Sequence, residues 1–232
     1  MRMKGLGLAL AWAALARSIS VSMAQSNTVT NISVFLRGGG SYNLICNPLN
    51  NTNNNDITNL FHVVQDGDAI YRWNPTIQDL DPNPYDFRPP VPPGELKAWH
   101  FILQPGEAVF YLNAGHNVTQ TFVGEIIHGP YTNPIPYGSI AVLGGGLYNA
   151  YGSISPVTQN ITNVLAGLAP ADGDQIFFWD PNTQDFAPNG PTYSAFLHSW
   201  FPSTNVVQPG IGFFYMRAAP EQSQWVRNYT VQ

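Results

Sequence analysis

The sequence is poor in cysteine and in charged side chains, and both shortages exclude classes of structure. Its 232 residues include one cysteine, Cys46, so no internal disulfide can form and a hydrophobic core must hold the chain together. The neighbours of Cys46 in YNLICNPL are mostly apolar. They favour a buried thiol over the alternative, an intermolecular disulfide.

Basic residues become scarcer still once the N-terminal segment is set aside. Arg2 and Lys4 precede an apolar run, Gly5 to Ala16, that is too short to span a bilayer. Ser22-Met23-Ala24 then fits the small-x-small pattern that signal peptidase cleaves. Residues 1–24 are therefore predicted to be a secretory signal peptide, with an uncleaved amphipathic anchor as the alternative.

The remainder carries six basic against fourteen acidic residues, a net charge of −8, and Lys97 is its one lysine. Without a basic patch, nucleic acid and anionic lipid are not expected partners. No later stretch is apolar enough to cross a membrane. These features predict a secreted protein, extracellular or at the cell surface.

Motifs of catalysis are also missing. The histidines lack the spacing of a zinc-binding helix, and no nucleophile elbow or phosphate-binding loop with its lysine occurs. Glu107 and Glu125, which lie in or beside expected strands, are candidates for the carboxylate pair of a glycoside hydrolase, but nothing singles them out from the other acids. We therefore predict that the protein is not an enzyme, with a secreted glycoside hydrolase ranked third among the functions considered.

The most informative feature present is an internal repeat. DGDAIYRWNPTIQDL starts at Asp66 and DGDQIFFWDPNTQDF starts at Asp172, at an offset of 106 residues. Downstream, LQPGEAVFYL matches VQPGIGFFYM at an offset of 104. The repeat predicts two tandem homologous modules. The predicted boundaries are an N-terminal β-prone segment at 25–40, a first module at 41–131, a proline-rich joint at 132–138 and a second module at 139–232.

Local patterns favour strands. AIYRW and QIFFW are short, aromatic and bounded by turn formers, and Asx-Pro and Pro-Gly turns recur along the chain. One short helical turn is expected in each half, with Asp56 or Thr162 near its N-cap. The predicted fold class is all-β: two tandem homologous β-sandwich or barrel-like modules with very little helix.

The order GSYNLICNPL, DGDAIYRWN and QPGEAVFYL resembles a module of many secreted bacterial surface proteins. The second copy matches the last two blocks and departs at the first, where GSIAVLGGGLYNAYGSISP lacks the Asn-Leu pair. The resemblance implies a β fold, an extracellular location and no catalytic residues.

The repeated Asp-Gly-Asp sequences offer two interpretations. Asp66 and Asp68, with Asp172 and Asp174, are carboxylates of the kind that bind Ca²⁺. No complete calcium-loop sequence follows them, and carboxylates in such turns commonly accept backbone N–H bonds. The structural turn is the favoured interpretation, and Ca²⁺ is the one cofactor considered.

Aromatic residues suggest carbohydrate binding as an alternative function. Trp73 matches Trp179 across the repeat, and matched positions favour a role in the core. The better candidates for exposed rings lie in expected loops with no matched partner. These candidates are Tyr85, Phe87, Tyr148 and Tyr151.

The N-terminal segment suggests assembly. Residues 26–40 contain a β-prone stretch, and strand addition between subunits builds fibres. The candidate assembly residues are Val29, Ile32, Val34 and Phe35. The alternative is that this segment pairs within its own chain.

The function predicted first is that of a non-catalytic structural or adhesive protein, such as a self-assembling matrix, surface-layer or filament subunit. Its expected partners are copies of itself or other extracellular components. A lectin-like module that binds polysaccharide, with or without Ca²⁺, is the alternative.

Overall fold

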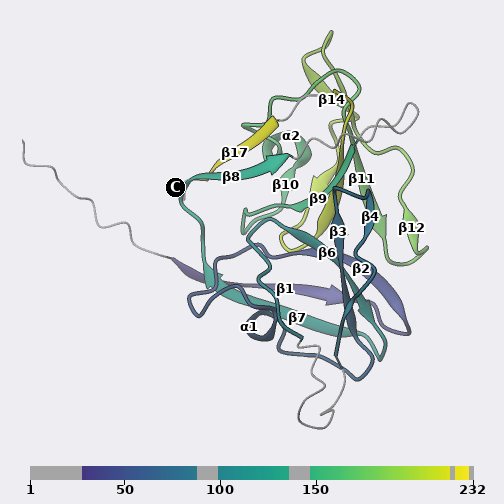
Figure 1. Ribbon diagram of the computed structural model, residues 1–232. Coiled ribbons are helices and arrows are strands. Elements are labelled where there is room, and N and C mark those ends of the chain that lie inside the picture. The colour runs from purple at the N-terminus through teal and green to yellow at the C-terminus, as the bar shows by residue number, and fades with distance from the viewer. Residues whose placement is uncertain (1–27, 88–98, 136–146, 220–222, 230–232) are drawn as a thin grey trace, which may run out of the picture.

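The structure is a computed structural model that describes residues 28–87, 99–135, 147–219 and 223–229 (Figure 1). The predicted signal peptide lies outside these residues. Strands dominate, which confirms the all-β class. The first half contains β1 (Val29–Leu36), β2 (Ser41–Cys46), α1 (Ile57–Leu60), β3 (Ala69–Asn74), β4 (Asp79–Leu80), β5 (Tyr85–Asp86), β6 (Ala108–Asn113) and β7 (Val118–Glu125).

The second half repeats this order with small additions. Its elements are β8 (Gly129–Ile135), β9 (Leu147–Gly152), β10 (Gln159–Asn160), α2 (Ile161–Val164), β11 (Gln175–Asp180), β12 (Asp185–Phe186), β13 (Thr192–Ser194), β14 (Ser199–Phe201), β15 (Val206–Val207), β16 (Gly212–Arg217) and β17 (Ser223–Tyr229).

Strand pairing is equivalent in the two halves, and the ladders between the described strands are antiparallel. A sheet of order β2-β6-β3-β4 in the first half corresponds to β9-β16-β11-β12 in the second. A two-stranded ribbon accompanies each sheet, β1 with β7 and β8 with β17. This equivalence concerns strand order and pairing, and the origin of the halves in one duplicated module remains a prediction from the sequence.

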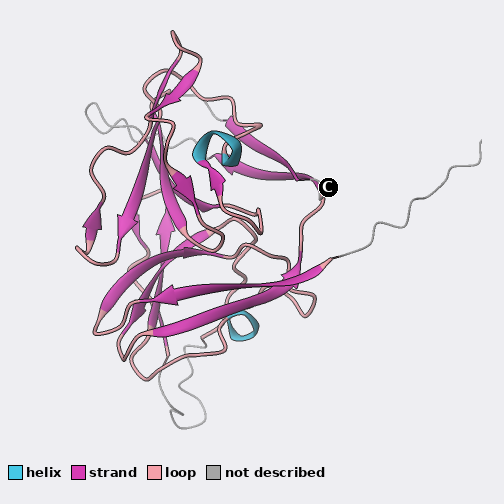
Figure 2. Cartoon of the chain, turned by 180° about the vertical axis from the view of Figure 1, so that it is seen from behind, coloured by secondary structure: helices cyan, strands magenta, loops and turns pink. Residues whose placement is uncertain are grey.

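The halves stack so that the two sheets face one another and the ribbons lie outside. Figure 1 shows the β1–β7 ribbon running crosswise to the strands of the first sheet, and Figure 2 shows the same arrangement from behind. Three apolar clusters separate the layers. The first core lies between the β1–β7 ribbon and its sheet, the interface cluster between the sheets, and the second core under the β8–β17 ribbon.

Side-chain alternation along the central strands produces this layering. In β6, Val109 and Tyr111 point into the first core, while Ala108 and Phe110 point into the interface cluster. Successive strand residues face opposite sides of a sheet, so a strand covered on both sides needs apolar residues throughout. That requirement accounts for the unbroken runs AVFYL and GFFYM.

Among the described residues, each half contains one short helix with a side-chain cap. The Asp56 carboxylate accepts the Thr58 backbone N–H, which confirms the expected cap of α1. In α2 the cap is Asn160, which accepts from Thr162 N–H. Thr162, expected near the N-cap, lies two residues after it and donates its N–H to the capping side chain. Within the described residues, neither helix is long and apolar enough to cross a membrane.

Part of the predicted joint belongs to a strand. Thr132 to Ile135 belong to β8, which pairs along its length with β17, so this stretch is a strand and not a linker. Residues 136–138 of the predicted joint lie outside the described residues. β1, predicted as a separate segment, belongs to the first half through its ladder with β7.

Small residues let the two sheets approach closely. Cys46 ends β2 and Gly152 ends β9, so the two occupy equivalent positions on facing strands. A Cβ atom added to Gly152 would overlap the Cys46 Sγ, so only one of the two positions has room for a side chain. A Cβ on Gly212 would similarly lie 2.8 Å from that of Ala108, its equivalent in β6.

We predict that Gly152→Ala lowers the free energy of unfolding by about 1–3 kcal/mol, because the new methyl group overpacks the interface. Cys46→Gly added to Gly152→Ala should restore part of this loss, since it removes the overlapping side chain. Chemical unfolding followed by circular dichroism measures both effects. If the losses in the double variant simply add, with Cys46→Gly alone as the reference, the steric explanation fails.

Candidate functional site

The repeated Asp-Gly-Asp turns serve the scaffold. Asp68 is fully buried, and its Oδ2 accepts hydrogen bonds from Gln65 N (2.8 Å) and the Tyr111 hydroxyl (2.5 Å). Its Oδ1 accepts from Ala114 N at 2.8 Å. One carboxylate thereby joins the turn before β3 to the end of β6. Burial, and then the bond to Asp68, raise the pKa of the Tyr111 phenol.

The second half repeats this network. Asp174 is fully buried and accepts from Ala171 N and Ala218 N, each at 2.8 Å, and from the Tyr215 hydroxyl. Arg217 adds a bond of 3.3 Å to the same carboxylate. Burial and Asp174 raise the pKa of the Tyr215 phenol.

These contacts bear on the candidate calcium ligands. Asp68 and Asp174 direct their oxygen atoms to donors within the protein, while Asp66 and Asp172 are exposed. The described residues contain no group of three or more His, Cys, Asp or Glu side chains suited to a metal ion. The turn role is thus seen directly, and calcium binding stays a prediction.

The repeated tryptophan and glutamine reach across to the opposite half. From the first half, the Trp73 indole Nε1 donates to the Tyr148 carbonyl at 2.7 Å. The Gln78 Oε1 accepts from Tyr148 N at 2.7 Å, and its Nε2 donates to the Tyr148 carbonyl at 3.2 Å. These two side chains therefore satisfy both backbone groups of Tyr148, in β9 of the second half.

The reciprocal contacts run from the second half to the first. The Trp179 indole donates to the Tyr42 carbonyl at 2.8 Å, and Gln184 accepts from Tyr42 N at 2.8 Å and donates to its carbonyl at 3.2 Å. Both glutamines have left-handed backbone conformations, with φ of 55° at Gln78 and 56° at Gln184. We call these four side chains and their two tyrosine backbones the clasp.

A second pair of reciprocal contacts lies at the other end of the interface. The Cys46 N–H donates to the Gly210 carbonyl at 2.9 Å, and the Gly152 N–H donates to the Gly106 carbonyl at 3.0 Å. Each Gln-Pro-Gly turn therefore receives the end of a strand from the opposite half. Cys46 is fully buried as a free thiol, as the sequence indicates, and burial raises its pKa to about 12.

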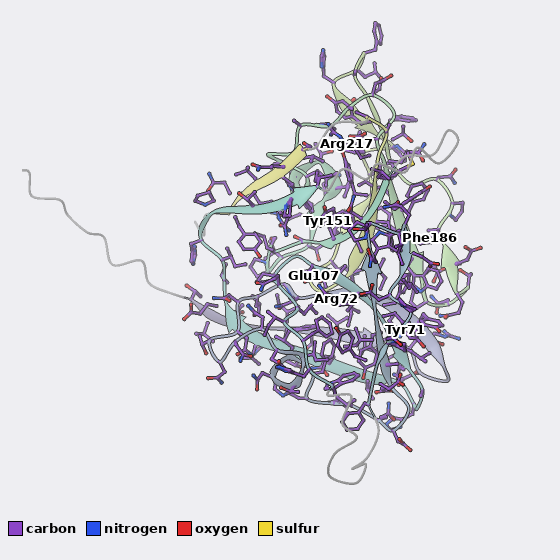
Figure 3. All side chains as sticks on the ribbon, viewed as in Figure 1. Tyr71, Arg72, Glu107, Tyr151, Phe186 and Arg217 are labelled. Atoms are coloured by element: carbon purple, nitrogen blue, oxygen red, sulfur yellow. The ribbon has the colours of Figure 1, made fainter. Side chains whose placement is uncertain are left out.

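Beside the clasp, the two sheets enclose an apolar cleft of about 560 Å³. Eight aromatic side chains contribute to its walls, three from the first half and five from the second, together with Leu80, Gln78 and Asp79 at the β4 side. The aromatic residues are Tyr42, Trp73, Phe110, Tyr148, Phe177, Trp179, Phe186 and Phe214. We call this the aromatic cleft, and Phe186, which is labelled in Figure 3, comes from β12.

A second cleft of about 400 Å³ lies between β3, β6, β8 and β9. Arg72 and Glu107 line it as an ion pair of 2.5 Å, side by side in Figure 3. The Arg72 guanidinium also lies 4.9 Å from the Phe101 ring centroid. Glu125 lines neither of these two clefts, so neither of them holds both candidate glycosidase carboxylates, Glu107 and Glu125.

The candidate carbohydrate-binding aromatics do not form one exposed platform. Tyr148 and Tyr151 lie in β9 and not in a loop, and Tyr151 is buried with its hydroxyl bonded to the Pro134 carbonyl. Tyr85 is in β5 and packs on Phe101, with ring centroids 4.4 Å apart. The loop assignment of YNAYG is wrong because β9 is completed by pairing with β16, which is distant in sequence.

Phe87 follows β5 and is half-buried against Trp99, with ring centroids 5.7 Å apart. Of the four candidate ligand-binding aromatics, only Tyr148 lines the aromatic cleft, and Tyr151 lines the second cleft. The sequence signal for the cleft is the match between Trp73 and Trp179, both of which line it. From the sequence alone, their matched positions favour a role in the core.

The candidate assembly residues all lie in β1. Ile32 and Val34 point into the first core, while Val29 and Phe35 are 61% and 62% exposed. β1 pairs with β7 within the chain, which is the alternative considered for this segment. In the part of the chain that the structure describes, only one side of β1 is paired.

A further exposed apolar group lies on the β13–β14 hairpin. Phe196 is 90% exposed in its turn, next to Leu197, and Phe201 in β14 is 70% exposed. Exposed apolar groups of this size often mark contact surfaces. The corresponding part of the first half falls among residues 88–98, outside the described residues.

Comparison of the chain with known protein families, with curated proteins and with solved structures finds no match.

We predict that replacing both clasp glutamines, Gln78→Ala with Gln184→Ala, lowers the free energy of unfolding by about 1–3 kcal/mol, at about 0.5–1.5 kcal/mol for each side chain, because water can replace the lost bonds at these partly exposed positions. Urea unfolding followed by tryptophan fluorescence measures the change. Gln224→Ala, an exposed position on β17, is the matched control. Equal stability of the double variant and this control would contradict the role of the clasp.

We also predict that the protein loses stability as the pH rises above 10. Tyr111 and Tyr215 have folded-state pKa values raised above the ordinary 10.0, so their stabilisation is complete below pH 10. Above it, phenols of the unfolded chain release protons that the folded state retains, and each group removes about 1.4 kcal/mol per pH unit. Urea unfolding at pH 9 to 12 tests this, and Tyr111→Phe with Tyr215→Phe should flatten the slope. An unchanged slope would contradict it.

Proposed function

We propose that this protein is a secreted, non-catalytic structural or adhesive protein that assembles through the open edge of β1. Filament, surface-layer and matrix subunits are the forms that this role takes. The observation that carries the proposal is the edge of β1, which is unpaired among the described residues and has none of the usual protection.

The ladder between β1 and β7 determines which backbone groups face outward. The Ile126 N–H bonds to the Thr28 carbonyl, so the even-numbered residues of β1 are the hydrogen-bonded positions of this antiparallel pair. The odd-numbered residues therefore direct their N–H and C=O groups away from β7. These are Val29, Asn31, Ser33 and Phe35, and their side chains are exposed as well.

β1 lacks the residues that usually prevent an edge strand from pairing with a strand of another molecule. Natural edge strands are commonly protected by lysine, proline, inward-pointing charges or bulges. The sequence VTNISVFL contains no charge, no proline and no glycine. An edge of eight residues with apolar side chains at 29 and 35 suits pairing with a strand of another copy.

The other ribbon edges contrast with this one. β8, the equivalent of β1, contains Pro130 and Pro134, which have no N–H to offer. The outer side of β7 is partly occupied, because Glu125 and Asn50 exchange backbone bonds of 2.8 and 3.0 Å. β1 is therefore the ribbon strand best suited to strand addition.

The use of polar residues supports a non-catalytic role. The buried Asp68 and Asp174 hold turns and strand ends together, and Glu107 is bound to Arg72. Side chains that first suggested chemistry thus have structural partners. Two packed sheets with an open strand edge are suited to forming an interface between subunits.

We predict that the secreted protein forms regular polymers, visible by negative-stain electron microscopy and as high-mass species in light scattering. Asn31→Lys with Phe35→Lys should leave it monomeric, because the charges repel an incoming strand and no core residue changes. The double variant Thr119→Lys with Val123→Lys is the matched control. These two residues of β7 lie directly opposite Phe35 and Asn31, one strand further from the edge.

Polymers in the control but not in the β1 variant would support assembly through this edge. A monodisperse native protein, or polymers in both variants, would contradict it. Deletion of the segment is a poorer test, since it removes the buried Ile32, Val34 and Leu36 and with them part of the first core. Thermal unfolding of each variant verifies that the fold is retained.

A further inference from the structure

We propose that the aromatic cleft between the two sheets is a binding site for a small organic cation with apolar substituents, such as a quaternary or aryl ammonium. This site is separate from the β1 edge and does not depend on the proposed assembly. The inference rests on the size of the cleft, the chemistry of its walls and the single charge at its rim.

The size of the cleft distinguishes it from ordinary packing. Protein interiors contain few voids larger than a water molecule, whereas ligand pockets measure roughly 300–1,000 Å³. At about 560 Å³ the cleft falls in the second range. Trp73, Phe177 and Trp179 are only partly buried there, unlike the central residues of the two cores. Apolar surface of this extent remains accessible to a ligand.

The walls consist mainly of rings, and the indole and glutamine groups among them already have hydrogen-bond partners. Both indole N–H groups are bound to the carbonyls of Tyr42 and Tyr148, and the Gln78 amide is bound to Tyr148 and Pro75. A ligand that depends on several directional hydrogen bonds, such as a sugar, would find few partners among these groups. The remaining surface is suited to apolar and cation–π contacts.

Ring packing holds the walls in place. The Trp73 and Phe214 centroids are 5.0 Å apart at an interplanar angle of 89°, and Phe110 and Trp179 are 5.0 Å apart at 80°. Phe186 meets Trp179 edge to face at 5.2 Å. Contacts between rings of both halves fix the cleft before any ligand enters, which limits the entropy lost on binding.

The charge at the rim of the cleft favours a ligand of positive charge. Asp79 is exposed and lines the cleft, and no Lys, Arg or His is among the described residues of its walls. A carboxylate beside aromatic faces attracts a cation and repels an anion, and desolvated cation–π contacts strengthen the attraction. The net acidic charge of the chain acts in the same direction.

The equivalence of the halves supplies a matched control for this carboxylate. Asp185 occupies the position of Asp79 in β12, and each accepts the next residue's N–H at 2.7 Å. Asp185 does not line the cleft. The substitutions Asp79→Asn and Asp185→Asn therefore make the same local change, but only the first alters the charge at the site.

The test uses benzyltrimethylammonium as the probe, with titration calorimetry and tryptophan fluorescence on the full secreted protein. We expect saturable binding that Asp79→Asn weakens about three- to tenfold and Asp185→Asn leaves unchanged. Phe186→Ala, which removes a wall, should weaken binding to a similar extent. Phe196→Ala, an equally drastic change at an exposed hairpin position, should not.

Neutral and anionic analogues of the probe distinguish the alternatives. Neopentylbenzene has the same shape without charge, and benzenesulfonate carries the opposite charge. Weaker binding of both supports the proposal. Binding of neopentylbenzene as tight as that of the cation, equal effects of Asp79→Asn and Asp185→Asn, or no binding of any probe would each overturn it. Because assembly has a separate readout, either proposal can fail alone.

Discussion

The structure depends on one constraint: two antiparallel sheets are covered on both faces, once by their own ribbons and once by each other. Antiparallel sheets commonly leave one face to water, and their strands then alternate apolar and polar residues. Here β6 and β16 are covered on both faces. Phe110 and Phe214 meet in the interface cluster, while Tyr111 and Tyr215 enter separate cores. Without the other half, each sheet would expose its apolar residues of the interface cluster to water.

The clasp and the close approach at Gly152 are consequences of this stacking. Facing sheets leave strand backbone groups at their borders, and in the clasp these groups have side-chain partners from the opposite half. Trp73 and Gln78 supply these for Tyr148, and their equivalents supply them for Tyr42. A reciprocal arrangement brings equivalent residues close together where the halves meet, so Cys46 and Gly152 must differ in size even though their positions match. At this contact the two equivalent positions cannot both carry a side chain, so their residues have to differ.

The two proposals rest on two different features of the structure, an outer strand edge and an internal cleft. Assembly uses β1, an edge that the stacking leaves outside and that the ribbon does not protect. Ligand binding uses the aromatic cleft, which exists because rings from two halves meet without filling the space between them. A rigid interface serves both, since it fixes the orientation of the edge and the walls of the cleft. The β13–β14 hairpin, with Phe196 exposed, is a further feature present on one half only among the described residues.

The sequence by itself determined the local features. Turn residues, short aromatic strands and the Asp56 cap depend on neighbours within a few positions, so the all-β class and the first cap could be predicted. Only the tertiary structure decided which strands meet. It placed Tyr148 in a strand, made Thr132 to Ile135 part of β8, and sent Trp73 into the opposite half. Trp73 and Tyr148 are 75 residues apart, and no local pattern encodes a contact that forms only after two sheets have folded and stacked.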